Sequence, residues 1–175
     1  MTDTPQLGSF VRALTIADVI EETADAKSIV FDIPAGGEDD FRYTPGQFLT
    51  LRIPSDRTGS VARCYSLSSS PTEDARLKVT VKRTIDGYGS NWLCDNAAAG
   101  MSMHVLAPSG IFTPKNLDQD FILLAAGSGI TPVMSILKSA LAQGTGHIVM
   151  VYANRDENSV IFKDELQDLQ RKNPD

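Results

Sequence analysis

The hydrophobic and polar positions of this chain follow two different periods. Up to about residue 110 short runs alternate apolar and polar residues, as in Leu77–Lys82, where Leu77, Val79 and Val81 are separated by polar side chains. Such alternation predicts strands with one buried face. We expect strands at 11–21, 27–33, 47–53, 62–68, 77–82 and 101–106, with one short helix at 90–96. Short strands at this spacing favour an antiparallel barrel or sandwich.

The last third of the chain alternates strands with helices. A polar, proline-broken stretch at 114–120 predicts a linker. Beyond it we expect a strand at 121–126, a helix at 130–143, a strand at 147–152 and a helix at 159–172, which is typical of a parallel α/β sheet. Two strands and two helices cannot cover both faces of such a sheet. We therefore expect the chain to be the N-terminal part of a longer protein.

Composition narrows the function classes. The chain has 175 residues and a formal net charge of −6, and this acidic balance argues against a nucleic-acid partner. No apolar run approaches membrane-spanning length and residues 1–10 are too polar for a signal sequence, so we expect a cytoplasmic protein without membrane contact. Cys64 and Cys94 have no disulfide or metal spacing and are expected to be small, partly buried residues.

The segment Gly127–Pro132 joins the 121–126 strand to the following helix. Gly127 and Gly129 remove side chains where backbone N–H groups would approach a pyrophosphate, and the helix start offers unpaired donors. Pro132 suits a first helical turn. Tight turns also use glycine for geometry alone, but the strand–turn–helix context favours a nucleotide phosphate.

The segment Arg63–Ser66 is a second candidate site. Strand alternation puts Arg63 and Tyr65 on one face. Tyr65 would stack on a flat ring system, and the Arg63 guanidinium would pair with a pyrophosphate. The alternative is an ordinary strand with a surface arginine and a half-buried tyrosine.

Two further stretches support a phosphate site. The strand that ends at Val81 and Lys82 offers backbone groups and an ammonium. A glycine loop with Gly89 runs into the short helix, where we expect Ser90 to be the N-cap and the N–H groups near Asn91 to face an anion. Taken singly, each feature has a simpler explanation: Ser90 caps the helix, and Lys82 is a solvated surface lysine. Together with the other glycine turn, they predict two phosphate sites and two dinucleotides.

In this order and spacing the motifs resemble those of the ferredoxin–NADP reductase-like flavoproteins. That family has an R-x-Y-S/T signature, a G-x-x-S loop and a G-x-G-x-x-P turn, matched here by Arg63–Ser66, Gly87–Ser90 and Gly127–Pro132. The resemblance implies a two-domain β + α/β fold. A flexible tail (1–9) would precede a six-stranded antiparallel Greek-key FAD barrel (10–113), a linker (114–120) and the first half of a parallel α/β nicotinamide-binding domain (121–175).

Residues 43–66 and 124–141 further resemble one group within this family, the reductase components of 3-ketosteroid 9α-hydroxylases. This likeness implies an oxygenase component as electron acceptor and a C-terminal [2Fe–2S] domain. The iron–sulfur ligands would lie outside this chain, because its two cysteines cannot supply four-cysteine spacing.

The resemblance also implies a reaction: hydride passes from NADH or NADPH to FAD, and electrons pass on to an iron–sulfur centre. It assigns Arg63 and Ser90 to the FAD pyrophosphate and Tyr65 to the flavin ring. Ser66, near the reactive ring nitrogen, and Thr131, towards the nicotinamide, are the candidate catalytic residues; Thr131 has packing of the helix start as its alternative role. The other candidate cofactor contacts are Cys64, Val81, Lys82, Gly89, Asn91, Gly127, Ser128, Gly129, Pro132 and Arg155.

Some choices stay open. Arg155 follows the 147–152 strand at the edge where adenosine riboses bind, and it could pair with a 2′-phosphate. Asp156 and Glu157 would repel that phosphate, which favours NADH. His104 and His147 receive no catalytic role, and no metal site is expected. A flavin-binding module without turnover, or a reductase of the flavohaemoglobin or phenylacetyl-CoA-oxygenase type, are the alternative functions.

Overall fold

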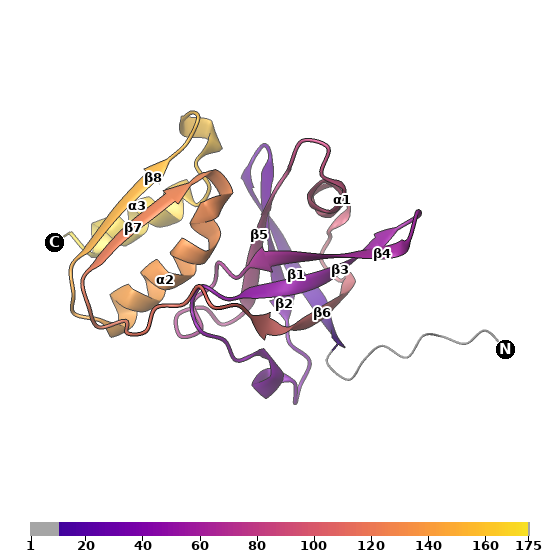
Figure 1. The fold of residues 1–175 in the computed structure, drawn as a ribbon, viewed down its shortest axis with the longest axis horizontal. Coiled ribbons are helices and arrows are strands. Elements are labelled where there is room, and N and C mark those ends of the chain that lie inside the picture. Colours follow the sequence, from indigo (N-terminus) through magenta and orange to yellow (C-terminus); the bar gives the residue numbers. More distant parts are fainter. Residues whose placement is uncertain (1–10, 175) are drawn as a thin grey trace.

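The computed structural model describes residues 11–174, which form two parts lying side by side (Figure 1). The tail predicted at 1–9 lies outside the described residues. The first part contains β1 (Val11–Thr23), β2 (Ala26–Asp32), η1 (Glu38–Phe41), β3 (Phe48–Ser55), β4 (Gly59–Ser66), β5 (Leu77–Lys82), α1 (Tyr88–Asn96) and β6 (Ser102–Ser109). The second contains β7 (Phe121–Ala126), η2 (Gly127–Gly129), α2 (Ile130–Gln143), β8 (Ile148–Ala153), η3 (Glu157–Ser159) and α3 (Lys163–Lys172).

The first part is the predicted six-stranded antiparallel sheet, in the order β4-β3-β6-β1-β2-β5. Alternation along each strand sends one set of side chains inward, so Ile29 and Phe31 of β2 and Val79 and Val81 of β5 are fully buried. They belong to one apolar core that also includes Leu51 of β3. A single bridge between Leu67 and Val79 joins the end of β4 to β5 and curls the sheet into a barrel.

The seam between β4 and β5 opens beyond that bridge. An antiparallel ladder continued from Leu67 and Val79 would next pair Ser66 with Thr80 and Tyr65 with Val81. Within residues 11–174 no such pairing forms, and β5 remains in a ladder with β2 alone. Backbone groups of β5 along this seam are therefore left without strand partners, and a cleft forms between the two strands.

The second part is the predicted strand and helix alternation. Strands β7 and β8 pair in parallel, with Phe121 opposite Ile148. Helix α2 lies between this two-stranded sheet and the barrel, and α3 packs beside it (Figure 1). The other face of the sheet exposes four apolar side chains to between 55% and 77%: Ile122, Leu124, Val149 and Val151.

The last helix differs from the expectation of 159–172, because α3 begins at Lys163. Asp156 and Ser159 form a reciprocal capping box around the 3₁₀ turn η3, and Phe162 then takes a left-handed conformation with φ of 61°. The local cap and the reversed backbone at Phe162 stop the turn from continuing into the helix. None of the helices in residues 11–174 combines the length and apolar character needed to cross a membrane.

Candidate functional site

The open seam of the barrel widens into a cleft of about 550 Å³ that also reaches the start of α2. Its walls come from β4, β5, the loop before α1, the first turn of α1 and the glycine turn before α2. Nine residues predicted from the sequence line it: Arg63, Cys64, Tyr65, Ser66, Lys82, Gly89, Ser90, Ser128 and Thr131. The fold thus brings the two glycine turns, 40 positions apart in the sequence, to one site.

Arg63 and Tyr65 both approach Gly89 at the start of α1. A Cβ atom added at Gly89 would lie 2.9 Å from Arg63 Cγ and 3.4 Å from Tyr65 Oη. The two side chains therefore lie on the same side of β4, as strand alternation predicts. Burial raises the pKa of Tyr65 to about 12, although the nearby Arg63 charge acts in the opposite direction. The phenol stays neutral near pH 7 and offers an uncharged flat surface beside a cation.

The neighbouring residues of β4 lie in different surroundings. Ser66 is the last residue of β4 and lines the cleft together with Tyr65. Cys64 is exposed, with Sγ 3.4 Å from Thr50 Oγ1. The expectation that Cys64 is partly buried is therefore wrong, because the outer side of β4 is not covered. Cys94 is buried in the barrel core, and burial raises the pKa of its thiol.

Helix α1 begins earlier than predicted. Its first residue is Tyr88 and its N-cap is Gly87, so the assignment of Ser90 as N-cap is wrong. Ser90 Oγ instead accepts a hydrogen bond of 3.1 Å from the Thr84 N–H inside the preceding loop. Asn91 Nδ2 closes the same loop by donating to the Thr84 carbonyl oxygen at 3.1 Å. Both side chains hold the loop in shape, and the first N–H groups of α1 have no partner within the helix.

Strand β5 supplies a cation and backbone groups to the seam. Lys82 lines the cleft, and its Nζ atom lies 3.6 Å from Asp25 Oδ2. Val81 does not line the cleft: its side chain is fully buried in the barrel, and its carbonyl oxygen accepts a 3.7 Å hydrogen bond from Cys94 Sγ. Burial would raise the pKa of Asp25, but the Thr23 hydrogen bond and the charges of Lys82 and Arg155 lower it overall. Asp25 is therefore ionised near pH 7.

Arg155 lies away from the cleft lining and contacts the barrel. Its Nη2 atom donates to Asp25 Oδ2 at 3.1 Å, and 73% of its side chain is exposed. The carboxylate of Asp25 is thus shared by Lys82 from the barrel and Arg155 from the α/β part. This partner for Arg155 lies in a part of the chain too distant for sequence reasoning to find.

The glycine turn before α2 leaves open space in front of its backbone. Gly127 has φ of 50°, a left-handed conformation that favours glycine, and a Cβ atom at Gly127 or Gly129 would meet nothing within 4 Å. The Gly127 carbonyl oxygen accepts a hydrogen bond of 2.9 Å from Tyr152 Oη, which ties the turn to β8. Pro132 lies in the first turn of α2, as predicted.

Thr131 is buried beside this turn, and Ser128 shares the cleft lining with it. The Thr131 hydroxyl donates to the Ser128 carbonyl oxygen at 3.1 Å. This local bond satisfies the hydroxyl and stabilises the helix start, which is the packing role considered for Thr131. Its place in the cleft lining also makes it available to a ligand. The structure therefore leaves both roles for Thr131.

Five further residues line the cleft: Thr80, Thr84, Asp86, Gly87 and Tyr88. Strand alternation alone assigns Thr80 only to the polar side of its strand. Asp86 has a positive φ of 58°, and its position before Gly87 is a turn signal that could have been used. Tyr88 Oη donates to the Pro54 carbonyl oxygen at 2.7 Å, which links the start of α1 to β3.

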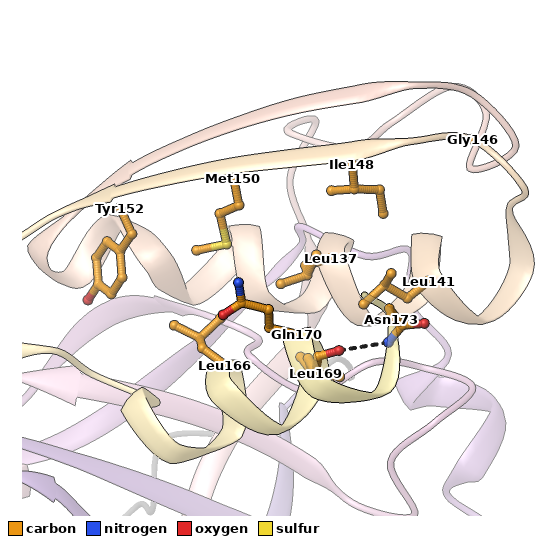
Figure 2. A pocket seen from close by; sticks show the side chains of 10 residues that line it. All are labelled: Leu137, Leu141, Gly146, Ile148, Met150, Tyr152, Leu166, Leu169, Gln170 and Asn173. Atoms are coloured by element: carbon orange, nitrogen blue, oxygen red, sulfur yellow. Dashed lines mark hydrogen bonds between the residues drawn. The ribbon is translucent and has the colours of Figure 1, made fainter. Parts of the chain in front are cut away.

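A second cavity of about 340 Å³ lies between β8, α2 and α3 (Figure 2). Ile148 and Met150 of β8 point towards Leu166 of α3 and Leu137 of α2, and no charged side chain lines the space. Its polar side chains are Tyr152, Gln170 and Asn173, and it has no cation to pair with a phosphate. Residues 11–174 contain no group of three or more His, Cys, Asp and Glu side chains arranged to hold a metal ion.

The cleft at the barrel seam has the chemistry of a dinucleotide site. The first turn of α1 and the glycine turn before α2 converge on it, and Arg63 and Lys82 add positive charge beside the single carboxylate of Asp86. The neutral Tyr65 ring and the unpaired edge of β5 suit a flat heterocycle with hydrogen-bonding groups. The residues present therefore fit a flavin dinucleotide.

The family assignment agrees with this geometry. Two family models match, described as "Oxidoreductase FAD-binding domain" over residues 13–113 and "Oxidoreductase NAD-binding domain" over residues 123–175. The first covers more than half of the chain. The chain therefore belongs to the ferredoxin–NADP reductase-like oxidoreductases, with an FAD-binding barrel and an NAD-binding α/β part.

Within this family the chain is similar to particular curated proteins. The chain is 71% identical over 178 residues to the ferredoxin reductase component of 3-ketosteroid-9-alpha-monooxygenase from Mycolicibacterium smegmatis, which covers 100% of this chain and 50% of the relative. The chain spans about half the length of the curated relatives it matches.

Two solved structures share the fold. The FAD/NAD-binding domain of nitric oxide dioxygenase from Vibrio cholerae matches with a TM-score of 0.82 and 25% identity, over 93% of this chain and 70% of that chain. Phthalate dioxygenase reductase, described as modular for electron transfer from pyridine nucleotides to [2Fe–2S], matches with a TM-score of 0.78 and 29% identity, over 90% of this chain and 48% of that chain.

Proposed function

We propose that this protein is an NAD(P)H-dependent flavin reductase, the electron-transfer component of a monooxygenase that acts on ketosteroids. The observation that carries the proposal is the convergence of two glycine-rich helix starts, one from each part, on a single cleft beside Arg63 and Tyr65. When bound there, FAD would supply the redox chemistry by accepting a hydride and releasing single electrons. The protein's own residues bind and orient the two ring systems.

The barrel side holds the flavin dinucleotide in this proposal. Arg63 pairs with the pyrophosphate through its forked donors, and the N–H groups at Gly89 and Ser90 complete that site. Tyr65 stacks on the ring, while the backbone at Val81 and the Lys82 ammonium face the ring edge along the open seam. Cys64 borders the same space, and Asn91 acts indirectly by holding the loop before α1.

The α2 side holds the nicotinamide dinucleotide. Backbone N–H groups at Gly127, Ser128 and Gly129 receive its pyrophosphate, and Pro132 leaves the helix start without a competing N–H. Ser66 and Thr131 lie where the two rings would meet, and we assign them to orienting the reacting atoms. NADH is the favoured donor, because Arg155 is paired with Asp25 and Asp156 and Glu157 repel a 2′-phosphate.

The acceptor is proposed from likeness. The matched relatives are reductase components of a monooxygenase and are about twice as long as this chain. We infer that electrons pass to a [2Fe–2S] domain that follows the described part in the full protein, and from there to an oxygenase component. A cytoplasmic location is part of the same proposal.

Anaerobic titration tests the function directly. The purified protein should be yellow, and NADH should bleach the flavin band. A yellow protein whose colour persists would favour a flavin-binding module without turnover. A colourless protein that also fails to take up added FAD would refute both functions. A comparison of NADH with NADPH in the same experiment tests the assigned donor.

Tyr65→Ala tests the ring site. Stacking of a base on an aromatic side chain is commonly worth about 1–3 kcal/mol, so FAD affinity should fall by roughly five- to 150-fold. Equilibrium dialysis with FAD measures the change. Tyr43→Ala is the matched control, because Tyr43 is a partly buried barrel tyrosine that bonds to Ser69 and does not line the cleft. Equal losses of FAD in the two variants would remove Tyr65 from the site.

A further inference from the structure

Four charged side chains from four segments meet where α2 packs on the barrel. Lys138 Nζ lies 2.7 Å from Asp74 Oδ2 and 3.0 Å from Glu165 Oε1. Lys78 Nζ lies 3.2 Å from the other Glu165 oxygen. We call these four residues the Lys138 cluster. Its two ammonium groups balance its two carboxylates, and only 6% of the Lys138 side chain is exposed.

The Lys138 cluster joins the two parts of the molecule. Asp74 and Lys78 belong to the barrel, whereas Lys138 is in α2 and Glu165 in α3. Asp74 Oδ2 also accepts a 2.6 Å hydrogen bond from the Ser70 N–H, which fixes its loop. A second polar link, 2.8 Å between Ser70 Oγ and Ser139 Oγ, lies beside it.

Two of the four segments that meet in the Lys138 cluster, α2 and β5, also line the cleft. Thr131 precedes Lys138 by seven residues on α2, which is about 10 Å along the helix axis. Lys82 follows Lys78 by four residues on β5, which is about 13 Å along the strand. Because a helix and a paired strand are stiff, a displacement at the cluster changes the separation of Thr131 and Lys82 across the cleft.

We propose that Lys138 is a positioning residue that fixes the start of α2 against β5 and thereby sets the separation of the two ring systems in the cleft. This inference rests on the proposed function for its catalytic consequence. A buried ammonium with two carboxylate partners favours one arrangement of the interface, since any other would leave the Lys138 charge buried and unpaired. Hydride transfer needs close approach, and a misplacement of about 1 Å can cost about 100-fold in rate.

The test compares Lys138→Met with Lys163→Met. Lys163 is the first residue of α3 and also forms an ion pair, but its partner Glu157 belongs to the same part of the molecule. In Lys138→Met the rate of flavin reduction at saturating NADH should fall at least tenfold, while FAD retention and the NADH concentration for half-saturation stay within twofold. Lys163→Met should match the unmodified protein, and Lys138→Arg should recover part of the rate because it keeps the cation.

Amide hydrogen exchange supplies a readout without turnover. In Lys138→Met, residues 135–143 of α2 and residues 70–76 of the barrel should both exchange faster, and in Lys163→Met neither should.

The double variant Lys138→Met with Asp74→Asn should react no more slowly with NADH than Lys138→Met alone, since the pair is already broken. If Lys138→Met does not fold, the reduction rate and hydrogen exchange are measured in Asp74→Asn and Glu165→Gln instead. Asp74→Asn removes the carboxylate partner from the barrel, and Glu165→Gln removes the one from α3.

Two results would overturn the proposal. One is a reduction rate in Lys138→Met within twofold of the unmodified protein; the other is a loss of rate that follows an equal loss of FAD, which would make the role purely structural. Failure of the proposed function looks different. A yellow parent protein that NADH does not bleach would refute the reductase, while hydrogen exchange would still decide whether the Lys138 cluster holds the two parts together.

Discussion

The barrel and the α/β part bury their apolar residues in different ways. Six strands enclose the barrel core, in which Phe31 and Leu51 are fully buried. Within residues 11–174 the sheet of the α/β part has two strands, and only its face towards α2 and α3 is covered, while Leu124 on the other face is 68% exposed. The barrel therefore contains the contacts that define its own shape. The α/β part takes part of its position from the barrel.

The contacts between the two parts are both apolar and polar: Ala26 of the barrel belongs to the apolar core of the α/β part, and the Lys78 ammonium lies 5.2 Å from the centre of the Phe162 ring. The interface holds the Lys138 cluster, the Ser70–Ser139 hydrogen bond and the Arg155–Asp25 ion pair. Interfaces between domains are generally more polar than domain cores, which permits relative motion. Here the cleft lies on that interface, with walls from both parts.

The largest difference between the two parts is expected in the free energy of unfolding, when an apolar residue is truncated in the barrel core or on the exposed sheet face. Phe31→Ala removes a fully buried ring from the barrel core and should lower the free energy of unfolding by about 3–5 kcal/mol. Leu124→Ala, on the exposed sheet face, should change it by less than about 0.5 kcal/mol. Denaturant unfolding of both variants measures the difference. Similar losses in the two would mean that the outer sheet face is covered in solution.

A pair of glycine variants sharpens the comparison at the cleft. At Gly89 a Cβ atom would lie 2.9 Å from Arg63 Cγ and 3.0 Å from Ile53 Cδ1, so Gly89→Ala should displace Arg63 and weaken FAD binding about tenfold, ~1.4 kcal/mol. Gly129 has φ of −62° and open space in front of it, so Gly129→Ala should leave stability and FAD affinity unchanged. It should weaken NADH binding alone. Calorimetry with each nucleotide distinguishes the sites, and an unaltered NADH affinity in Gly129→Ala would move that ligand elsewhere.

The sequence predicted the elements better than the contacts between them. Alternation at Leu77–Lys82 and the glycine turn at Gly127–Pro132 are local signals, and both elements formed as expected. The start of α1 was wrong because Ser90 was judged from its residue type, whereas Gly87 and the Thr84 loop set the cap. The partners of Arg155 and Lys138 come from distant segments, and no local pattern encodes such pairs.

Titration to alkaline pH should show which of the two parts holds FAD, because each part contains a tyrosine whose pKa is raised. The pKa of Tyr65 is raised to about 12 because burial disfavours the phenolate. Its contribution to stability is complete below the ordinary pKa of about 10 and is lost as pH rises through 12. Tyr65→Phe should remove that part of the loss, about 1 kcal/mol after solvent screening.

Tyr152 in the α/β part, whose pKa burial also raises, serves as the matched comparison. Ultraviolet difference titration follows ionisation of the phenols, and flavin fluorescence follows release of FAD. FAD should be released as Tyr65 ionises in the unmodified protein and in Tyr152→Phe alike. Release that follows Tyr152 instead would mean that the α/β part holds the flavin more directly than its position in the cleft suggests.

The smallest expected effect concerns the rate at which a thiol reagent labels Cys94, which should not change in Lys138→Met. Both cysteines belong to the barrel, Cys64 exposed and Cys94 buried with its thiol pKa raised by burial, so thiol labelling reports on the barrel alone. A thiolate reagent should modify Cys64 readily and Cys94 only when the barrel opens. If the barrel defines its own shape, Lys138→Met loosens the α/β part and leaves the Cys94 rate within twofold. Mass spectrometry of labelled peptides measures both rates. Faster labelling of Cys94 would mean that the barrel core draws stability from the interface, and the two parts would then have to be treated as one cooperative unit.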